Sequence, residues 1–345
     1  MHSEDVLCQR QKNLGIITLA RPKALNALTH SMVQAIYAQL QSWEQDNAIH
    51  AVVIRSEGDK AFCAGGDVRW LYEHGRQDVA TCLEFFRDEY RLNQYIADYP
   101  KPYIALMQGL TMGGGVGVSL HGAYPIAGEK FQFAMPETTI GFFPDIGASH
   151  LLAKCPGAIG MYLGLTGLRL NAQDALYCGL IKKIIPAEAF DELLDVIAGL
   201  DLQQDAEKQL DTCMQNFALP SSSAPVTIME NLSKIDTYFS VNNFDEILLK
   251  LQADSQDPWA ESVLRTVLQK SPLSLLVTFE QLQRTKQLSL AACLAIDYTL
   301  VRHFMQDHDF YEGVRALLID KDNAPQWVPS HISSVDHPMV ENYFR

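Results

Sequence analysis

The sequence predicts an α/β protein in which parallel strands alternate with helices, followed by a region that is helical only. Two observations predict this class. Up to Gly199, short apolar segments of strand length alternate with segments that repeat apolar residues at helical spacing, which is typical of strand–helix–strand units with a parallel sheet. From residue 225 onward only helical periodicity is present. The chain therefore divides into a core at 1–199 and a helical C-terminal region at 200–345.

The first part of the core is predicted to contain two strands and two helices. Segments 14–20 and 51–56 are short and apolar, as buried strands are. Thr29 is a suitable N-cap for the amphipathic helix that follows it. A second helix, rich in aromatic residues, spans 79–99 and ends at Pro100.

Two glycine turns interrupt this alternation, and each lies just before a helix. An apolar strand ending at Gln108 leads into the three glycines 113–115 and then into small residues with helical character. The other turn is Gly65–Gly66–Asp67, in which Asp67 is a natural N-cap. Glycine lets the backbone approach a bound group, and the first amides of a helix lack acceptors within it. Each turn can therefore donate amide hydrogens to an anion.

The amides of Gly66 and Gly114 are candidates for one shared site. If both meet a single carbonyl oxygen, they form an oxyanion hole, which stabilises the negative charge that develops on that oxygen in a transition state. Simple close packing between a strand and a helix is the alternative interpretation of either turn alone.

The segment MPETTIGFFPDIG, residues 135–147, places two carboxylates in an apolar stretch. Glu137 and Asp145 stand among Phe, Ile and Met residues, and removal from water raises the pKa of a carboxyl and makes it a better proton acceptor. Two other interpretations stay open. In the first, Glu137 is a core acid held in a salt bridge. In the second, Asp145 only forms a turn after Pro144.

The remainder of the chain is predicted as short helices, one strand and the helical region. Three short helices follow Gly147, and the segment IKKIIP reads as a last strand. The Ser/Pro-rich segment 219–225 is the best linker candidate. The sequence contains no internal repeat and no low-complexity tract.

Composition limits the compartment and the partners. A chain of 345 residues with 48% hydrophobic residues can bury a full core, and its net charge of −14 argues against a nucleic-acid partner. The seven cysteines are scattered without CxxC spacing, so we expect neither a disulfide framework nor a zinc site. This pattern indicates a reducing compartment. We find no signal peptide, no apolar run of membrane-spanning length and no metal motif such as HExxH. These features predict a protein that is cytoplasmic, or whose targeting segment is already removed, with no membrane partner and no metal.

Five motifs carry a resemblance to a known family: RPKALNAL, AFCAGGDVR, GLTMGGGVG, MPETTIGFFPDIG and EGVRALLIDKD. They resemble the crotonase (enoyl-CoA hydratase/isomerase) superfamily and, within it, the 3-hydroxyisobutyryl-CoA hydrolases, over nearly the whole chain. The resemblance implies a crotonase-like ββα spiral at 1–199, with the helical region at 200–345 covering the active site. It also implies an acyl-CoA thioester substrate and makes the amides of Gly66 and Gly114 the oxyanion hole.

Departures from the hydratase pattern bear on the reaction. Hydratases of the superfamily carry a catalytic Glu three residues past the oxyanion glycine, where this chain has Gly117. Glu137 fills the place of the second hydratase acid, and Asp145 stands where hydratases usually have glycine. These features, and a long helical insertion at roughly 225–290, resemble the hydrolases. The resemblance therefore implies thioester hydrolysis, with an enoyl-CoA hydratase or isomerase as the alternative.

The resemblance also implies roles for three side chains. Glu137 either attacks the thioester carbonyl, which gives a mixed anhydride, or acts as a general base on water. Asp145 holds the hydroxyl of the acyl chain or positions the water, since an apolar pocket alone discriminates poorly against an analogue without the hydroxyl. Glu73 matches a position that lines the substrate site, although an exposed helix carboxylate is the other interpretation.

The implied substrate is a short branched 3-hydroxyacyl-CoA, first among them 3-hydroxyisobutyryl-CoA of valine catabolism. CoA is then part of the substrate, and no separate cofactor is expected. Related folds form trimers and hexamers, so a homo-oligomer is one expectation, and a site capped within one chain by the long helical insertion is the alternative.

Three other classes of protein fit less well. A dinucleotide oxidoreductase needs GxGxxG, and the triple-glycine turn fails at the third glycine. A serine hydrolase needs GxSxG, but His121 stands at the last glycine position of the segment around Ser119. A binding protein that lost its chemistry is disfavoured by the two glycine turns and Glu137. Cys63, close to Gly65, has no evident basic partner and is expected to be a packed thiol.

Overall fold

The computed structural model describes residues 4–219 and 226–345. The chain forms two compact units, each drawn from three segments. The first consists of Met1–Gly66, Asp88–Phe133 and Arg169–Thr227, and the second of Asp67–Arg87, Ala134–Leu168 and Ile228–Arg345. Apart from Leu219, the predicted linker lies outside the described residues. The sequence analysis divided the chain at residue 199 into two continuous regions, whereas each of these units combines three separate segments. The division at residue 199 stays a prediction.

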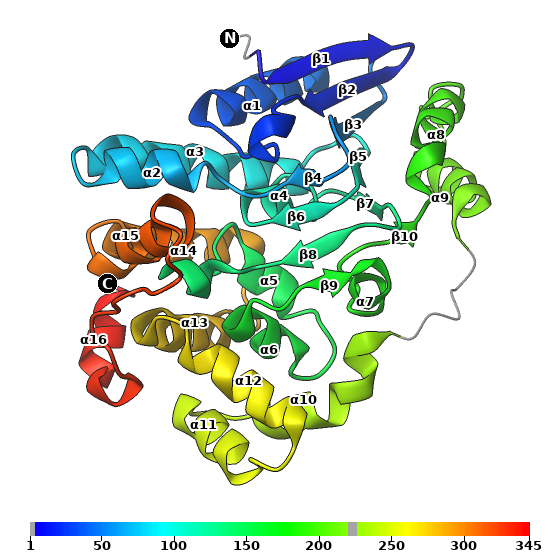
Figure 1. Cartoon of the computed structure of the whole chain (residues 1–345). Coiled ribbons are helices and arrows are strands. Elements are labelled where there is room, and N and C mark those ends of the chain that lie inside the picture. The colour runs from blue at the N-terminus through cyan, green and yellow to red at the C-terminus, as the bar shows by residue number, and fades with distance from the viewer. Residues whose placement is uncertain (1–3, 220–225) are drawn as a thin grey trace. The chain divides into compact units, whose positions relative to one another are not determined.

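A six-stranded sheet in the first unit has the order β1-β2-β3-β5-β7-β10 (Figure 1). Its strands are β1 (Val6–Gln11), β2 (Leu14–Leu19), β3 (Ala51–Ser56), β5 (Tyr103–Met107), β7 (Tyr124–Ala127) and β10 (Lys183–Ile184). β1 and β2 are antiparallel, and every other neighbouring pair is parallel. The predicted parallel arrangement is confirmed for β2, β3, β5 and β10, whereas the antiparallel β1 and the parallel β7 were not predicted as strands.

A second sheet has four strands in the order β4-β6-β8-β9. They are β4 (Ala61–Cys63), β6 (Leu110–Met112), β8 (Gln132–Ala134) and β9 (Leu170–Asn171). Gly109, between β5 and β6, has φ +74°, and a Cβ on it would lie 2.4 Å from the Lys60 carbonyl oxygen. Because β4 and β6 are parallel neighbours, the segments that follow them leave the sheet at the same end.

Helices surround the sheets of the first unit. They are α1 (His30–Gln45), the part of α3 (Val79–Ala97) from Asp88 onward, α4 (Gly114–Gly117), α7 (Ala172–Tyr177), α8 (Phe190–Ile197) and α9 (Ala206–Phe217), with 3-10 turns at Pro22–Ala24 and Ala187–Ala189. The apolar faces of α8 and α9 share one buried cluster with β2, β3, β5 and β7. That burial of apolar area, roughly 25 cal/mol for each Å², is the main stabilising contribution of these helices.

The second unit consists mainly of helices (Figure 1). They are α2 (Val68–Gly75), the first part of α3, η2 (Glu137–Ile140), α5 (Ala148–Leu152), α6 (Ile159–Thr166), η4 (Thr227–Asn231), α10 (Leu232–Phe239), α11 (Phe244–Ala253), α12 (Pro258–Leu268), α13 (Pro272–Thr285), α14 (Leu290–Phe304), α15 (His308–Val314), the π-helix η5 (Arg315–Ile319), η6 (Ile332–Ser334) and α16 (His337–Asn342). The helical prediction beyond residue 225 is confirmed for the described residues.

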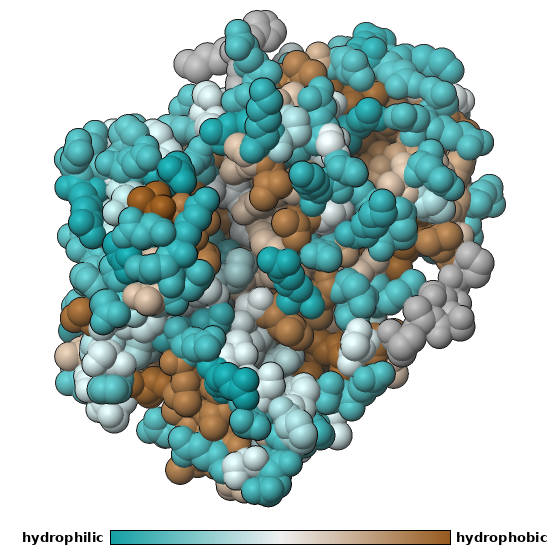
Figure 2. Space-filling model, in the orientation of Figure 1, coloured by the Kyte–Doolittle hydropathy of each residue, from teal (hydrophilic) through white to brown (hydrophobic). Residues whose placement is uncertain are grey.

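The face of the molecule in Figure 2 is mainly hydrophilic, with separate apolar areas between polar side chains. Large apolar side chains that stay exposed, such as Met229, Leu249 and Leu268, are scattered over several helices. Scattered exposure of this kind is normal for a folded protein. Within the described ranges, no helix combines the length and the apolar composition needed to cross a membrane.

Asn26 organises the loop formed by the RPKALNAL motif. Its side chain is 1% exposed, and its φ is +55°. Oδ1 accepts a hydrogen bond from the Arg21 amide at 2.9 Å, and Nδ2 donates to the carbonyls of Glu57 and Ala61 at 3.0 Å each. One side chain therefore ties this loop to both ends of the segment that leads into β4.

We expect Asn26→Ala to lower the free energy of unfolding by about 3 kcal/mol, because buried backbone groups lose their partners and Ala is strained in the left-handed region. Urea unfolding followed by circular dichroism measures the change. The control is Asn47→Ala at an exposed position, where we expect a change within about 0.5 kcal/mol. Equal effects of the two substitutions would contradict the role given to Asn26.

Candidate active site

The two glycine turns lie against each other in the first unit. β4 leads into Gly65–Gly66 and β6 into Gly113–Gly114. A Cβ built on Gly114 would lie 3.3 Å from the Gly66 nitrogen, and a Cβ built on Gly65 would lie 3.8 Å from the Gly114 nitrogen. Among the residues that the structure describes, neither the Gly66 nor the Gly114 amide has an acceptor. The turns are adjacent, and their predicted role as an oxyanion hole stays a prediction.

Backbone conformation explains why these turns are glycine. Gly65 has φ +109°, and Gly113 has φ +46° with ψ −123°, a region that L side chains rarely adopt. The carbonyls of the turns are already used, since Gly65 accepts from the Leu28 amide at 2.8 Å and Gly113 accepts from the Val116 amide at 2.8 Å. The amides of the residues that follow them remain available to a ligand.

Two buried polar side chains of α3 lie beside glycines of α4, and neither was predicted. Oε1 of Glu89 would lie 2.3 Å from a Cβ on Gly114, and Nδ2 of Asn93 would lie 2.6 Å from a Cβ on Gly117. Glu89 is 2% exposed and Asn93 is fully buried. With Ile96 they follow the helical spacing i, i+4, i+7. Polar residues within an apolar stripe were the sequence signal that could have found them.

Ser119 and Cys63 are packing residues of the first unit. The Ser119 hydroxyl donates a hydrogen bond to the Gly115 carbonyl at 2.6 Å. Burial raises the pKa of the Cys63 thiol to about 12. A nucleophilic serine needs a general base, and a nucleophilic cysteine needs a lowered pKa. These contacts agree with the packing roles expected from the sequence.

Glu137 begins η2 in the second unit, and its carboxyl is buried. The residue is 7% exposed. Burial first, and then the charge of Asp145, raise the pKa of Glu137 well above its usual value. Within the described part of the chain, Oε2 has no hydrogen-bond partner and the carboxyl forms no salt bridge. The alternative of a salt-bridged core acid is therefore not supported by the described contacts.

Asp145 lies in a tight turn of the second unit and is 5% exposed. Its backbone carbonyl accepts from the Ala148 amide at 2.9 Å, and Ile146 and Gly147 have φ +55° and +72°. Asp145 does belong to a turn, as one interpretation held. Its carboxyl is also close enough to Glu137 for its charge to raise that residue's pKa. The turn and the buried carboxyl pair are thus features of the same segment.

Asp297 on α14 is a third buried acid of this unit, and it was not predicted. Its side chain is fully buried, and burial, with a contribution from the charge of Asp145, raises its pKa well above the usual value. Oδ2 accepts from the Gly147 amide at 2.8 Å, and Oδ1 accepts from Gln281 Nε2 at 2.7 Å. The only sequence signal is one acid within the apolar helix LAACLAIDYTLVRHF.

Glu73 is an exposed residue of α2. Within the second unit, its surroundings are those of an exposed helix carboxylate, which was one of the two interpretations of Glu73. Its role in lining a substrate site stays a prediction.

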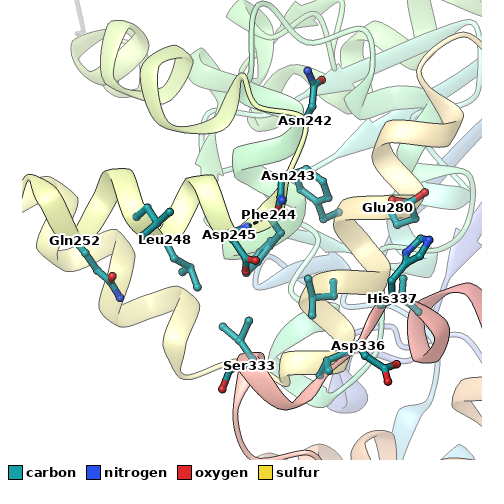
Figure 3. Close-up of a pocket in the computed structure, with 16 residues that line it drawn as sticks. Asn242, Asn243, Phe244, Asp245, Leu248, Gln252, Glu280, Ser333, Asp336 and His337 are labelled. Atoms are coloured by element: carbon teal, nitrogen blue, oxygen red, sulfur yellow. Dashed lines mark hydrogen bonds between the residues drawn. The ribbon is translucent and has the colours of Figure 1, made fainter.

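A cavity of about 940 Å³ opens elsewhere in the second unit, beside α11, α13 and α16 (Figure 3). Asp245, Glu280 and Asp336 line it together with apolar side chains of the same elements. Neither Glu137 nor Asp145 is among its lining residues. The candidate catalytic carboxyls therefore belong to a different part of this unit.

The two sets of groups have complementary chemistry. The first unit holds two adjacent amides, and a donor of this kind is worth roughly 3–4 kcal/mol when it binds a developing oxyanion. The second unit holds a buried carboxyl of raised pKa, which can act as a nucleophile or transfer a proton. Acyl transfer from a thioester requires both functions.

We expect Glu137→Gln to become more stable relative to the wild type as the pH rises. A carboxyl whose pKa is raised on folding contributes stability below its unfolded value of 4.5, and that contribution is lost as the pH rises through the folded value. Gln does not ionise and avoids this loss. Urea unfolding at about pH 4.5, 6 and 8 should show a growing difference between the variant and the wild type.

The control is Glu246→Gln on α11, where the side chain is exposed. The difference from the wild type should there be the same at each pH. A difference that stays constant for Glu137→Gln as well would show that its carboxyl is not desolvated.

Comparison with known proteins identifies relatives over nearly the whole chain. A family model described as enoyl-CoA hydratase/isomerase matches residues 14–344. The chain is 41% identical over 345 residues to the mitochondrial 3-hydroxyisobutyryl-CoA hydrolase of Gallus gallus, covering 99% of this chain and 89% of that protein. It is 39% identical over 346 residues to the Homo sapiens protein of the same name, with the same coverage.

Two solved structures are also similar. A carnitinyl-CoA dehydratase from Mycobacterium thermoresistibile has a TM-score of 0.91 and 35% identity, covering 99% of this chain and 97% of that one. An enoyl-CoA hydratase from Rhodobacter sphaeroides has a TM-score of 0.89 and 39% identity with the same coverage. The predicted crotonase-like α/β fold is confirmed, and the chain belongs to the enoyl-CoA hydratase/isomerase family.

Proposed function

We propose that this protein is an acyl-CoA thioester hydrolase that converts 3-hydroxyisobutyryl-CoA, a short branched 3-hydroxyacyl-CoA, to the free acid and CoA. The observation that carries the proposal is the buried Glu137 carboxyl, whose Oε2 has no partner among the described residues. The relatives from Gallus gallus and Homo sapiens, which carry the name of this hydrolase, support it.

Glu137 supplies the proton chemistry or the nucleophile in this proposal. Along one route its carboxylate attacks the thioester carbonyl, the C–S bond breaks, CoA leaves as a thiolate that takes a proton, and water then hydrolyses the mixed anhydride. Along the other route the carboxylate removes a proton from water as the water oxygen bonds to the thioester carbon, the C–S bond breaks, and CoA leaves as a thiolate that takes up this proton. On both routes the amides of Gly66 and Gly114 stabilise the charge on the thioester oxygen.

Two further carboxyls are proposed to contact the acyl group. Asp145 accepts a hydrogen bond from the 3-hydroxyl or positions the water, because its buried carboxyl can discriminate against an acyl chain without the hydroxyl. Glu89 is a candidate for a substrate contact because its carboxyl lies in the space beside the Gly114 α-carbon. Glu73 keeps its predicted role at the substrate site.

A hydratase or isomerase is the second candidate function. The solved relatives described as a dehydratase and a hydratase favour it. Gly117 in place of the hydratase acid argues for the hydrolase, and the structure fills the space beside Gly117 with the Asn93 amide. Release of free CoA thiol supports hydrolysis, whereas loss of enoyl absorbance without thiol release supports the second candidate.

Compartment, assembly and cofactors complete the proposal. We propose that the protein is cytoplasmic. Its seven cysteines, all in the described part of the chain, form no disulfide, which fits any reducing compartment. The curated relatives are named mitochondrial. Cell fractionation distinguishes the two. A homo-oligomer is proposed by analogy with related folds, and no cofactor is proposed beyond the CoA moiety of the substrate.

We expect Glu137→Gln to abolish thiol release while acyl-CoA binding changes little, because Gln keeps the shape of the side chain but cannot attack or remove a proton. Thiol release from 3-hydroxyisobutyryl-CoA gives turnover, and calorimetric titration with a non-hydrolysable thioether analogue gives binding. Glu246→Gln serves as the control and should turn over normally. Normal turnover with weak binding in Glu137→Gln would reverse the assignment.

We expect Asp145→Ala to reduce kcat/KM for 3-hydroxyisobutyryl-CoA by about 100-fold and to affect isobutyryl-CoA, which lacks the hydroxyl, much less. Thiol release from the two esters measures this difference. Asp211→Ala, at an exposed position of α9, is the control. An equal loss on both esters would mean that Asp145 does not recognise the hydroxyl.

A further inference from the structure

The turn that carries Asp145 has an unfavourable backbone conformation. Ile146 has φ +55°, and a β-branched residue in the left-handed region is a genuine outlier. Gly147 follows with φ +72° and is the N-cap residue of α5, where it has no side chain that could cap the helix. Such a conformation persists only where surrounding contacts impose it.

Two side chains from separate helices provide those contacts. Gln281 on α13 donates from Nε2 to the Pro144 carbonyl at 3.0 Å, and Asp297 on α14 accepts from the Gly147 amide at 2.8 Å. Gln281 Nε2 also donates to Asp297 Oδ1 at 2.7 Å, so the two side chains are joined. The bonds hold the backbone immediately before and two residues after Asp145.

Burial makes these contacts stronger than surface contacts of the same type. Both Gln281 and Asp297 are fully buried. A hydrogen bond inside a protein gains from the low local dielectric, and an unmet buried group is costly. Asp297 uses both carboxyl oxygens, and Gln281 uses both hydrogens of its amide. The Gln281 side-chain oxygen has no hydrogen-bond partner among the described residues, so the contacts of Gln281 with the turn and with Asp297 are made by its Nε2 alone.

We propose that Gln281 and Asp297 form a clamp that positions Asp145 for recognition of the acyl hydroxyl, and that they are positioning residues rather than catalytic ones. This inference rests on the proposed function. The clamp fixes the Pro144–Gly147 turn, and the turn fixes the direction of the Asp145 carboxyl. Loss of the clamp lets Ile146 relax toward a favourable conformation and moves that carboxyl.

The first test compares hydrolysis of 3-hydroxyisobutyryl-CoA with that of isobutyryl-CoA. We expect Asp297→Ala and Gln281→Leu to lower kcat/KM for the hydroxylated ester by about 100-fold, since a displacement of about 1 Å has an effect of this size, and to lower it much less for the other ester. Asp297→Asn keeps an acceptor for the Gly147 amide and should recover part of the loss.

Matched controls separate positioning from general destabilisation. Thr278→Val alters a buried side chain of α13 that has no hydrogen-bond partner among the described residues. Leu300→Ala removes buried volume from α14 without removing an acceptor. Neither should change the ratio of the two kcat/KM values. Equal losses on both esters in the Asp297 and Gln281 variants, or a changed ratio in the controls, would overturn the clamp.

The second test does not depend on activity. Hydrogen–deuterium exchange of the peptide that contains Gly147 should be at least about tenfold faster in Asp297→Ala than in the wild type, because the amide loses its acceptor. Unchanged exchange overturns the clamp. If the wild type releases no thiol from any ester, the proposed function is wrong, and the exchange result alone decides whether the clamp holds the turn.

Discussion

Close approach of two backbone segments is the constraint on which the first unit depends. β4 and β6 are parallel neighbours, so the chain leaves both strands at the same end and enters a glycine turn each time. A Cβ on Gly114 would overlap the Glu89 carboxyl at 2.3 Å and would lie 3.3 Å from the Gly66 nitrogen. A side chain at this position would displace the Glu89 carboxyl and crowd the Gly66 turn. Absence of side chains is therefore what keeps two free amides beside each other.

The second unit meets a different constraint, which is electrostatic. Glu137, Asp145 and Asp297 are all buried, and the charge of Asp145 acts on both of the others. Burial, with the charge of Asp145, makes Glu137 and Asp297 less easily ionised and raises their pKa values. Asp297 is partly compensated by the Gly147 amide and by Gln281. Glu137 has no comparable partner for Oε2 among the described residues, which suits a group that reacts.

The resemblance to this family implies that hydrolases and hydratases differ in where carboxyl groups stand around the proposed backbone oxyanion site. This chain has Gly117 at one acid position of the hydratases, and the Asn93 amide fills the space beside it. The Glu89 carboxyl of α3 lies beside Gly114, three residues before Gly117. The similarity to solved structures described as a hydratase and a dehydratase therefore extends to the fold more directly than to the reaction.

The sequence by itself determined the features that local interactions decide. It predicted the parallel strands, the helical region, both glycine turns and the capping of helices by Thr29 and Asp67, whose side chains accept from the Met32 and Trp70 amides. It also singled out Glu137 and Asp145, because acids in an apolar segment are conspicuous. Only the tertiary structure decided that Glu89 and Asn93 lie beside the glycines, and that Gln281 and Asp297 hold a turn far from them in sequence. The physical reason is that a buried polar side chain is satisfied by whichever segment the fold brings to it.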